Sequence, residues 1–379
     1  MKRFQLILLW IVGLLFLTGC KVQKEQQPME SAAPYIETEE IVVCASENPS
    51  AVMAVATVPP TPEQTRTPTE APTSEPTPLL QKYAAPDGVY TIAWISDPQH
   101  YSRLFPETYY AMTSFLRDHQ DALHLAYIIN TGDLVDTVDS ASEWDVADQA
   151  QSMIDEIPNG VLAGNHDMGA PVGYETFCAR FGEKRYRDKP WYGGSFENNR
   201  GHYDLITIGE TQYLFVYMGF EPSGKAIKWA GDVFREYPDR IGVLCLHDYY
   251  TKQLTLSDDG KKWYSRVVQK TPNLYMVLCG HKYGAYCFPE SFDDDGDGKD
   301  DRTVYQLLFN YQASLRDGGG GYLRLIQINE AAGTMYHLTY SPFLNDFNRF
   351  DDPNNREEYY PFDENNEEFT LPLPWKIEH

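Results

Sequence analysis

Acidic, amide and imidazole side chains stand within three residues of the ends of five short apolar runs. The runs are YTIAWIS (90–96), LAYIIN (125–130), GVLA (160–163), IGVLCL (241–246) and LYMVLC (274–279). The residues of interest that follow them are, in the same order, Asp97, Asp133, Asn165, His247 and His281. Such side chains suit divalent metal ions. A single Asp or Asn after a glycine is often a turn former, but five in series favour a shared metal site.

One reaction that metal ions held by such side chains can catalyse is hydrolysis at phosphorus. Two cations about 3.5–4 Å apart can clamp the attacking and leaving oxygens of an in-line displacement. A metal-bound hydroxide, formed from water whose pKa falls towards about 7, then serves as the nucleophile. No Ser or Cys nucleophile is needed, and the sequence has no G-x-S-x-G motif.

The apolar runs alternate with helix-like stretches at 107–123, 142–157 and 223–237. This alternation predicts an α/β domain with largely buried sheets, which we place at 83–345. Because ligands bind at the carboxyl ends of strands in open α/β sheets, we expect the five polar residues to converge there. Two further strands, 322–329 and 334–340, follow a glycine-rich turn, and we expect this hairpin to finish the second sheet.

The ordered motifs resemble those of the calcineurin-like metallophosphoesterase family, D-x-H, GD-x-x-D, GNH-D, H and GH-x-H. The resemblance covers about residues 88–345, and its most specific parts are GDLVD (132–136) and GNHD (164–167). It implies a four-layer α/β/β/α sandwich with a two-metal centre between the sheets. The implied cofactors are one or two divalent transition metal ions, Mn, Fe or Zn.

The resemblance also assigns metal ligands. Asp133 would bridge the two ions, and Asp97 and Gln99 would belong to the first site. The second site would be completed by Asn165, His247 and His281.

Two further residues receive catalytic roles from the resemblance. His166 would hydrogen-bond the phosphoryl group or protonate the leaving oxygen. Asp136 would orient and charge its imidazole. By contrast, we expect His202 to be structural.

Three positions depart from the family pattern. The first motif reads Asp97-Pro98-Gln99, with His100 one place late, although related secreted members share a D-x-Q form. Tyr283 replaces the second histidine of GH-x-H, and Thr137 stands where many members carry Arg. The first two changes affect the same ion. We therefore predict a strong second site and a first site that is weak, rebuilt with Tyr283 or His100, or empty.

An acidic segment at 293–301 contains D-x-D-x-D-G-x-x-D, which matches positions 1, 3, 5, 6 and 9 of an EF-type calcium loop. The calcium ligands would be Asp293, Asp295, Asp297 and Asp301. Val304 stands where the loop normally has its bidentate Glu. Calcium binding and a solvated acidic loop therefore both remain open.

The N-terminal part has the features of an exported lipoprotein. Residues 1–20 read as a signal peptide whose end, LTGC, resembles the bacterial lipobox and makes Cys20 the expected lipidation site. An ordinary secretory signal or an uncleaved anchor is the alternative. Residues 21–82, rich in Pro, Thr and Glu, are expected to be a disordered tether. The acidic C-terminal tail, 346–379, is expected to pack on the domain.

Composition limits the partners. The formal net charge is −24, which argues against a nucleic-acid-binding surface. It leaves room for a small phosphorylated substrate, because a bound metal can dominate the local charge. Of the six cysteines, Cys20 and Cys44 precede the domain; the others lack zinc-site spacing, and a Cys279–Cys287 disulfide stays open.

The sequence thus predicts metal-dependent hydrolysis of phosphate mono- or diesters. The expected location is the outer face of the cell membrane, reached through the N-terminal lipid. The alternative is a binding or scaffold lipoprotein that keeps the fold with one degraded metal site, because Gln99 and Tyr283 both weaken the first site.

Overall fold

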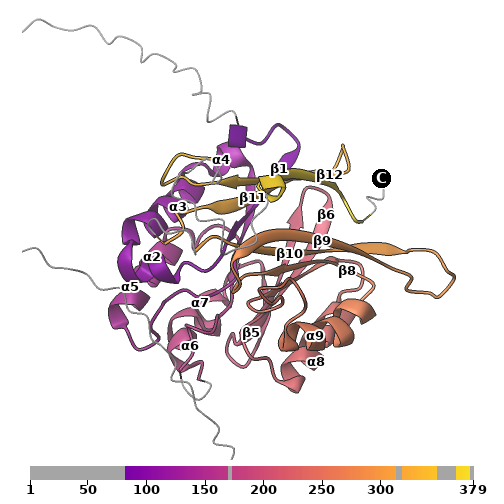
Figure 1. Ribbon diagram of the computed structural model, residues 1–379, viewed down its shortest axis with the longest axis horizontal. Coiled ribbons are helices and arrows are strands. Elements are labelled where there is room, and N and C mark those ends of the chain that lie inside the picture. The colour runs from indigo at the N-terminus through magenta and orange to yellow at the C-terminus, as the bar shows by residue number, and fades with distance from the viewer. Residues whose placement is uncertain (1–81, 170–172, 313–317, 348–363, 376–379) are drawn as a thin grey trace, which may run out of the picture. The chain divides into compact units, whose positions relative to one another are not determined.

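The computed structural model describes residues 82–169, 173–312, 318–347 and 364–375 (Figure 1). All of them belong to one compact unit, Pro72–His379. The predicted signal peptide, the lipidation site Cys20 and the tether up to residue 81 lie outside the described residues. So do residues 348–363 and 376–379 of the predicted tail.

The first sheet has six strands in the order β13-β12-β11-β1-β2-β3. Its strands are β1 (Val89–Ile95), β2 (Leu125–Asn130), β3 (Asn159–Val161), β11 (Leu323–Asn329), β12 (Thr334–Tyr340) and β13 (Glu368–Pro372). The strands β1, β2 and β3 run parallel, whereas β11, β12 and β13 pair antiparallel to their neighbours.

The second sheet has seven strands in the order β4-β5-β6-β7-β8-β10-β9. They are β4 (Tyr192–Phe196), β5 (Gly201–Ile208), β6 (Thr211–Met218), β7 (Ile241–Leu246), β8 (Leu274–Cys279), β9 (Gly284–Phe292) and β10 (Arg302–Asn310). The inner strands β6, β7, β8 and β10 are parallel, and the edges are antiparallel. Both sheets are therefore mixed.

Helices begin where the sequence supplies a start signal. They are α2 (Gln99–Leu104), α3 (Pro106–Asp118), α4 (Gln120–Leu123), α5 (Ala141–Ser152), α6 (Glu175–Phe181), α7 (Glu183–Tyr186), α8 (Gly224–Glu236) and α9 (Asp258–Arg266). Short 3-10 turns lie at Val268–Lys270 and Glu364–Asn366. Pro106 occupies the first turn of α3, and the serine side chains of Ser140, Ser223 and Ser257 cap α5, α8 and α9.

Three hydrophobic cores separate four layers. On β1, Ala93 and Ile95 face the core beneath α3 and α5, while Ile92 and Trp94 face the second sheet. The outer face of the second sheet packs against α8 and α9 through residues such as Leu244. Figure 1 shows α2–α5 and α8–α9 on opposite sides of the two sheets. The predicted α/β/β/α sandwich is confirmed.

The predicted position of the 322–340 hairpin was wrong. The hairpin, β11 and β12, joins the first sheet, with β11 antiparallel to β1 from Val89↔Asn329 to Trp94↔Arg324. The edge of the second sheet is occupied instead by β9, which pairs along its whole length with β10. Both faces of β11 are buried, so its apolar pattern fits either sheet and does not reveal which one it joins.

The described part of the tail, 364–375, adds the edge strand β13 to β12. The side chain of Trp375 reaches the core between the sheets. None of the described helices is long and apolar enough to cross a bilayer. The four cysteines of the described part, Cys178, Cys245, Cys279 and Cys287, are unbridged thiols.

Candidate metal centre

The chain turns sharply where the polar residues leave the strands. Asp97, Asp133 and His281 all adopt left-handed backbone, with φ of 53°, 57° and 66°. This region is uncommon for residues other than glycine, and such conformations cluster at functional sites. A Cβ atom at Gly164 would lie 2.0 Å from Oδ1 of Asp133, so the GNHD turn needs glycine there.

His247 is the best-oriented ligand. Its Nδ1 lies 2.8 Å from the carbonyl oxygen of Thr131, to which it donates a hydrogen bond. Its Nε2 lies 3.3 Å from Oδ1 of Asp133 and 3.1 Å from Oδ1 of Asn165. A hydrogen bond from the other ring nitrogen is how proteins fix a metal-binding imidazole.

The ligands predicted for the second site converge. Ligand atoms of Asp133, His247 and His281 lie within 4.8 Å of one another, and Asn165 contacts His247. Among the described residues, Asp133 and His247 of this group are buried and His281 is half-buried. Carboxylate, amide and imidazole donors together fit a divalent transition metal.

The electrostatics also fit a cation. Burial opposes a charge on His247, but the Asp133 carboxylate raises the pKa of the imidazole to about 10. Burial acts to raise the pKa of Asp133. The neighbouring His247 and His166 outweigh this effect and lower the Asp133 pKa overall. A positive charge is therefore favoured beside Asp133, whether on His247 or on a bound cation.

The residues predicted for the first site contact His281 and Asp133. Both carboxylate oxygens of Asp97 accept a hydrogen bond from the His281 amide, at 3.0 and 3.1 Å. Nε2 of Gln99 donates to Oδ2 of Asp133 at 3.0 Å. The Gln99 oxygen is buried without a hydrogen-bond partner among the described residues.

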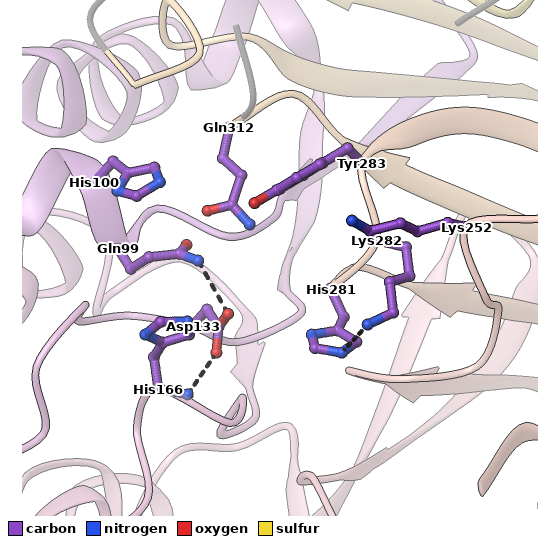
Figure 2. A pocket seen from close by; sticks show the side chains of 9 residues that line it. All are labelled: Gln99, His100, Asp133, His166, Lys252, His281, Lys282, Tyr283 and Gln312. Atoms are coloured by element: carbon purple, nitrogen blue, oxygen red, sulfur yellow. Dashed lines mark hydrogen bonds between the residues drawn. The ribbon is translucent and has the colours of Figure 1, made fainter. Parts of the chain in front are cut away.

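An orphaned buried oxygen is costly, and a neighbouring cation would satisfy it once the amide is turned. The two predicted substitutes, His100 and Tyr283, both line the cavity at this end (Figure 2). His100 does not belong to the cluster of three ligands found among the described residues. The donors present at the first site are thus mainly oxygens.

His166 is oriented by Asp136, though chiefly through the backbone. Its Nδ1 lies 2.9 Å from the Asp136 carbonyl oxygen and 3.5 Å from the carboxylate Oδ1. The Asp136 carboxylate also accepts a hydrogen bond from Arg103, a residue that no sequence motif marks. Burial disfavours the charged form of the His166 imidazole. The Asp133 carboxylate outweighs burial and raises the pKa of His166 overall.

Two buried carboxylates hold the loops. Asp167 accepts hydrogen bonds from the amides of Leu134 and Val135, at 2.7 and 3.0 Å, and from that of Gly164 at 2.8 Å. Glu143 accepts from the amides of Asp136 and Thr137 at 2.7 and 2.8 Å. Thr137, which stands where many family members carry Arg, is thus held through its backbone amide by Glu143.

A cavity of about 220 Å³ opens over these ligands (Figure 2). Sequence reasoning missed three of its lining residues, Lys252, Lys282 and Gln312. Lys282 occupies the variable position of the GH-x-H motif, which was the available signal. Lys252 and Gln312 stand in loops and carry no motif.

The predicted calcium ligands gather in the β9–β10 turn. Oxygen atoms of Asp293, Asp295 and Asp297 lie within 4.8 Å of one another, and all three residues are exposed. Asp301 accepts a hydrogen bond from the Asp294 amide at 2.7 Å. Exposed acidic groups commonly gather without an ion, so this geometry leaves both interpretations of the loop open.

Comparison with known proteins places this centre in context. The family model described as calcineurin-like phosphoesterase matches residues 90–315. The uncharacterized protein YvnB of Bacillus subtilis (strain 168) is 40% identical over 293 residues, which cover 76% of this chain but only 22% of YvnB. This chain therefore spans about a fifth of that relative.

Solved structures with a similar fold are more distant in sequence. GAP50, described as the anchor in the inner membrane complex of Plasmodium, is 8% identical with a TM-score of 0.45, covering 68% of this chain and 86% of its own. TT1561 of Thermus thermophilus is 16% identical with a TM-score of 0.41, covering 67% and 99%.

Proposed function

The chain belongs to the calcineurin-like phosphoesterase family, and from that premise we propose that it hydrolyses phosphate mono- or diesters with bound divalent metal ions. One observation carries the proposal. Side chains from the ends of strands in two different sheets, Asp133, His247 and His281, bring ligand atoms within 4.8 Å of one another beside a cavity. Imidazole and carboxylate donors that converge from distant parts of the chain on one point suit a divalent cation.

The chain's own residues have distinct tasks in this reaction. A bound divalent ion supplies Lewis acidity and lowers the pKa of a coordinated water. Asp133, Asn165, His247 and His281 would hold the ion, and the hydrogen bond to the Thr131 carbonyl fixes the His247 ring so that Nε2 faces Asp133 and Asn165. Gln99, which donates a hydrogen bond to Asp133, and Asp97 would hold a second ion.

His166 lines the same cavity and serves as the proton donor. Its Nδ1 proton is committed to the Asp136 carbonyl, so the charged ring offers its Nε2 proton to the leaving oxygen. The Asp133 carboxylate raises the pKa of this imidazole despite its burial, which favours the charged form that can donate.

The test is turnover of p-nitrophenyl phosphate and its bis ester by the full chain with Mn²⁺, Fe²⁺ or Zn²⁺. We expect hydrolysis that is lost on chelation, and His166→Ala to lower kcat by about 10²–10⁴-fold. Asp133→Asn should abolish both metal retention and activity. Lys228→Gln, on the exposed side of α8, is the matched control and should change neither. Metal-loaded protein that cleaves neither ester would refute the proposal.

One observation favours a second candidate, a binding or scaffold protein with little turnover. Nζ of Lys282 lies 2.6 Å from Nε2 of His281, where it competes with a cation for this ligand. The same turnover assay separates the two candidates, because a scaffold would bind metal or phosphate without releasing p-nitrophenol.

We also propose that the protein acts outside the cytoplasm, held to the membrane by a lipid on Cys20. The lipobox-like LTGC and the Pro/Thr/Glu-rich segment that follows support this location. Mass spectrometry of the N-terminal peptide from membranes should find an acylated Cys20. Cys20→Ser should move the protein out of the membrane fraction; retention there without acylation would contradict the proposal.

A further inference from the structure

The cavity over the metal centre has a cationic wall that the family motifs do not account for. Lys252 and Lys282 lie on one side of it, across from Gln99 and His100 (Figure 2). Lys282 is half-buried and follows the ligand His281 directly, whereas Lys252 is exposed at the cavity mouth. The chain has 55 acidic but only 31 basic residues, and two of the basic residues lie beside this one cavity.

Neither lysine is neutralised by direct contact with a carboxylate of the described residues. Within the described ranges, neither lies within 4.0 Å of a carboxylate oxygen. Two other lysines, on α9, show the contrast: Lys261 pairs with Asp258 at 2.8 Å and Lys262 with Asp259 at 2.6 Å.

The backbone holds both lysines in place. Lys252 stands in a tight turn, where the Thr251 amide donates to the Thr255 carbonyl oxygen at 2.7 Å and the Leu254 amide to that of Thr251 at 3.0 Å. The backbone at Lys282 is fixed through the preceding residue, because the His281 amide donates a hydrogen bond to the Asp97 carboxylate. A short, fixed backbone lowers the entropy lost when a side chain binds a ligand.

A cation at His281 releases Lys282. A neutral imidazole has one unprotonated nitrogen, and Nζ of Lys282 donates to it at Nε2, 2.6 Å away. If either ring nitrogen ligates a cation, the other carries the proton, and Nε2 can no longer accept from an ammonium group. The ammonium must then turn away from the ring, and the cavity is the polar space beside it.

We propose that Lys252 and Lys282 form an anion-binding wall that selects dianionic phosphoryl groups, and so makes phosphate monoesters the preferred substrates over diesters. This inference rests on the proposed function for its substrate class. The physical reason is that the attraction between fixed cations and an anion scales with the anion's charge, and a monoester's phosphoryl group carries twice the charge of a diester's. A cavity of about 220 Å³ exceeds the roughly 30 Å³ share of one water several-fold, which leaves room for a phosphoryl group.

The test measures binding without turnover. Calorimetry on the full chain loaded with Mn²⁺ compares phenylphosphonate, a dianion at pH 8.5, with its monomethyl ester, which carries one charge. We expect Lys282→Gln to weaken phenylphosphonate binding about tenfold, and the exposed Lys252→Gln about threefold. The affinity for the methyl ester, which carries half the charge, should fall only by about the square root of each factor. The preference for the dianion therefore falls in each variant.

Three controls make the outcome decisive. Lys282→Arg should keep most of the preference, since it retains the charge. Lys228→Gln should bind both probes as the unchanged chain does. Metal content and melting temperature of each variant must match the unchanged chain, which excludes loss of the His281 ligand as the cause.

The proposal is overturned if the unchanged chain binds neither probe, or if both lysine variants keep its affinity and its dianion preference. If the lysines govern binding but neither ester is hydrolysed, the anion-binding wall stands and the proposed hydrolysis fails. If hydrolysis occurs and the Lys→Gln variants change the KM for the monoester and the diester alike, the hydrolysis stands and the selectivity fails.

Discussion

At the residue scale, the two halves of the metal centre differ in their donors. Around His247 the donors are imidazole, amide and carboxylate atoms within mutual hydrogen-bonding distance. At the predicted first site, Gln99 takes the place of an imidazole, and its amide nitrogen donates a hydrogen bond to the Asp133 carboxylate. Neutral amide oxygen is a weaker ligand than imidazole for a transition metal, so the halves should differ in affinity.

This difference predicts metal stoichiometry. Purified protein dialysed against metal-free buffer should keep about one transition metal ion per chain, bound at the His247 side. Introducing Gln99→His together with Tyr283→His should raise the retained metal towards two ions, because both changes restore imidazole donors. Elemental analysis measures the ratio, with His247→Ala as the variant expected to lose the remaining ion. Two tightly held ions in the unchanged chain would contradict the prediction.

His202 provides a prediction about pH. It is buried in β5, with its ring stacked 4.5 Å from that of Tyr217. Burial lowers its pKa to about 3. The unfolded chain, with a histidine pKa near 6.5, therefore takes up a proton first as the pH falls, and stability present above pH 6.5 is lost progressively below it.

Between pH 6.5 and pH 5 this single group should remove about 2 kcal/mol from the free energy of unfolding. His202→Phe keeps an aromatic ring in the stack but cannot titrate, so its stability should decline less over that interval. Urea unfolding at the two pH values gives the comparison. Equal acid sensitivity of the two proteins would show that His202 does not stay neutral in the fold.

The sequence was informative about residues that stand next to strands. Asp133 and Asn165 were recognisable because a glycine and a buried apolar run precede each, and the structure brings both to His247. Lys252 and Gln312 were not recognisable, because a loop residue's position depends on how distant strands are arranged. Arg103 was missed for a similar reason: its partner, Asp136, is 33 residues away.

At the element scale, several buried strands were predicted to the residue, whereas the buried strand β6 and the edge strands were not. The runs at 125–130, 241–246 and 274–279 match β2, β7 and β8 to the residue. The edge strands β4 and β9 are partly exposed and mix glycine, proline and polar residues with apolar ones, so they give no clear pattern. The hairpin β11–β12 was predicted but assigned to the wrong sheet. Its pattern of apolar residues shows that the strands are buried, but not which strand they pair with.

The β9–β10 turn gives a prediction at this scale. If the turn binds calcium through Asp293, Asp295 and Asp297, millimolar calcium should stabilise the domain by about 1 kcal/mol, in keeping with weak extracellular sites. The melting temperature should then rise by about 2 °C, and Asp295→Asn with Asp297→Asn should remove the rise. A melting temperature unchanged by calcium and by chelator favours the solvated acidic loop.

At the scale of the whole domain, the described C-terminal segment ties the two sheets together. Strand β13 extends the first sheet through its pairing with β12. Trp375, three residues beyond β13, packs edge-on against Tyr213 of β6 at 5.7 Å and Tyr275 of β8 at 6.0 Å. The tail therefore contributes to the core that lies between the sheets.

Trp375→Ala should consequently lower the free energy of unfolding by about 3 kcal/mol, the cost of emptying a large buried aromatic site. Metal content at the His247 side should not change, because the strand ends that carry the ligands keep their own packing. Leu104→Ala is a suitable control, since Leu104 is 59% exposed and its truncation should change stability by no more than about 0.5 kcal/mol. Urea unfolding with parallel metal analysis tests both parts. A Trp375→Ala protein as stable as the control would mean that the sheets are held together without the tail.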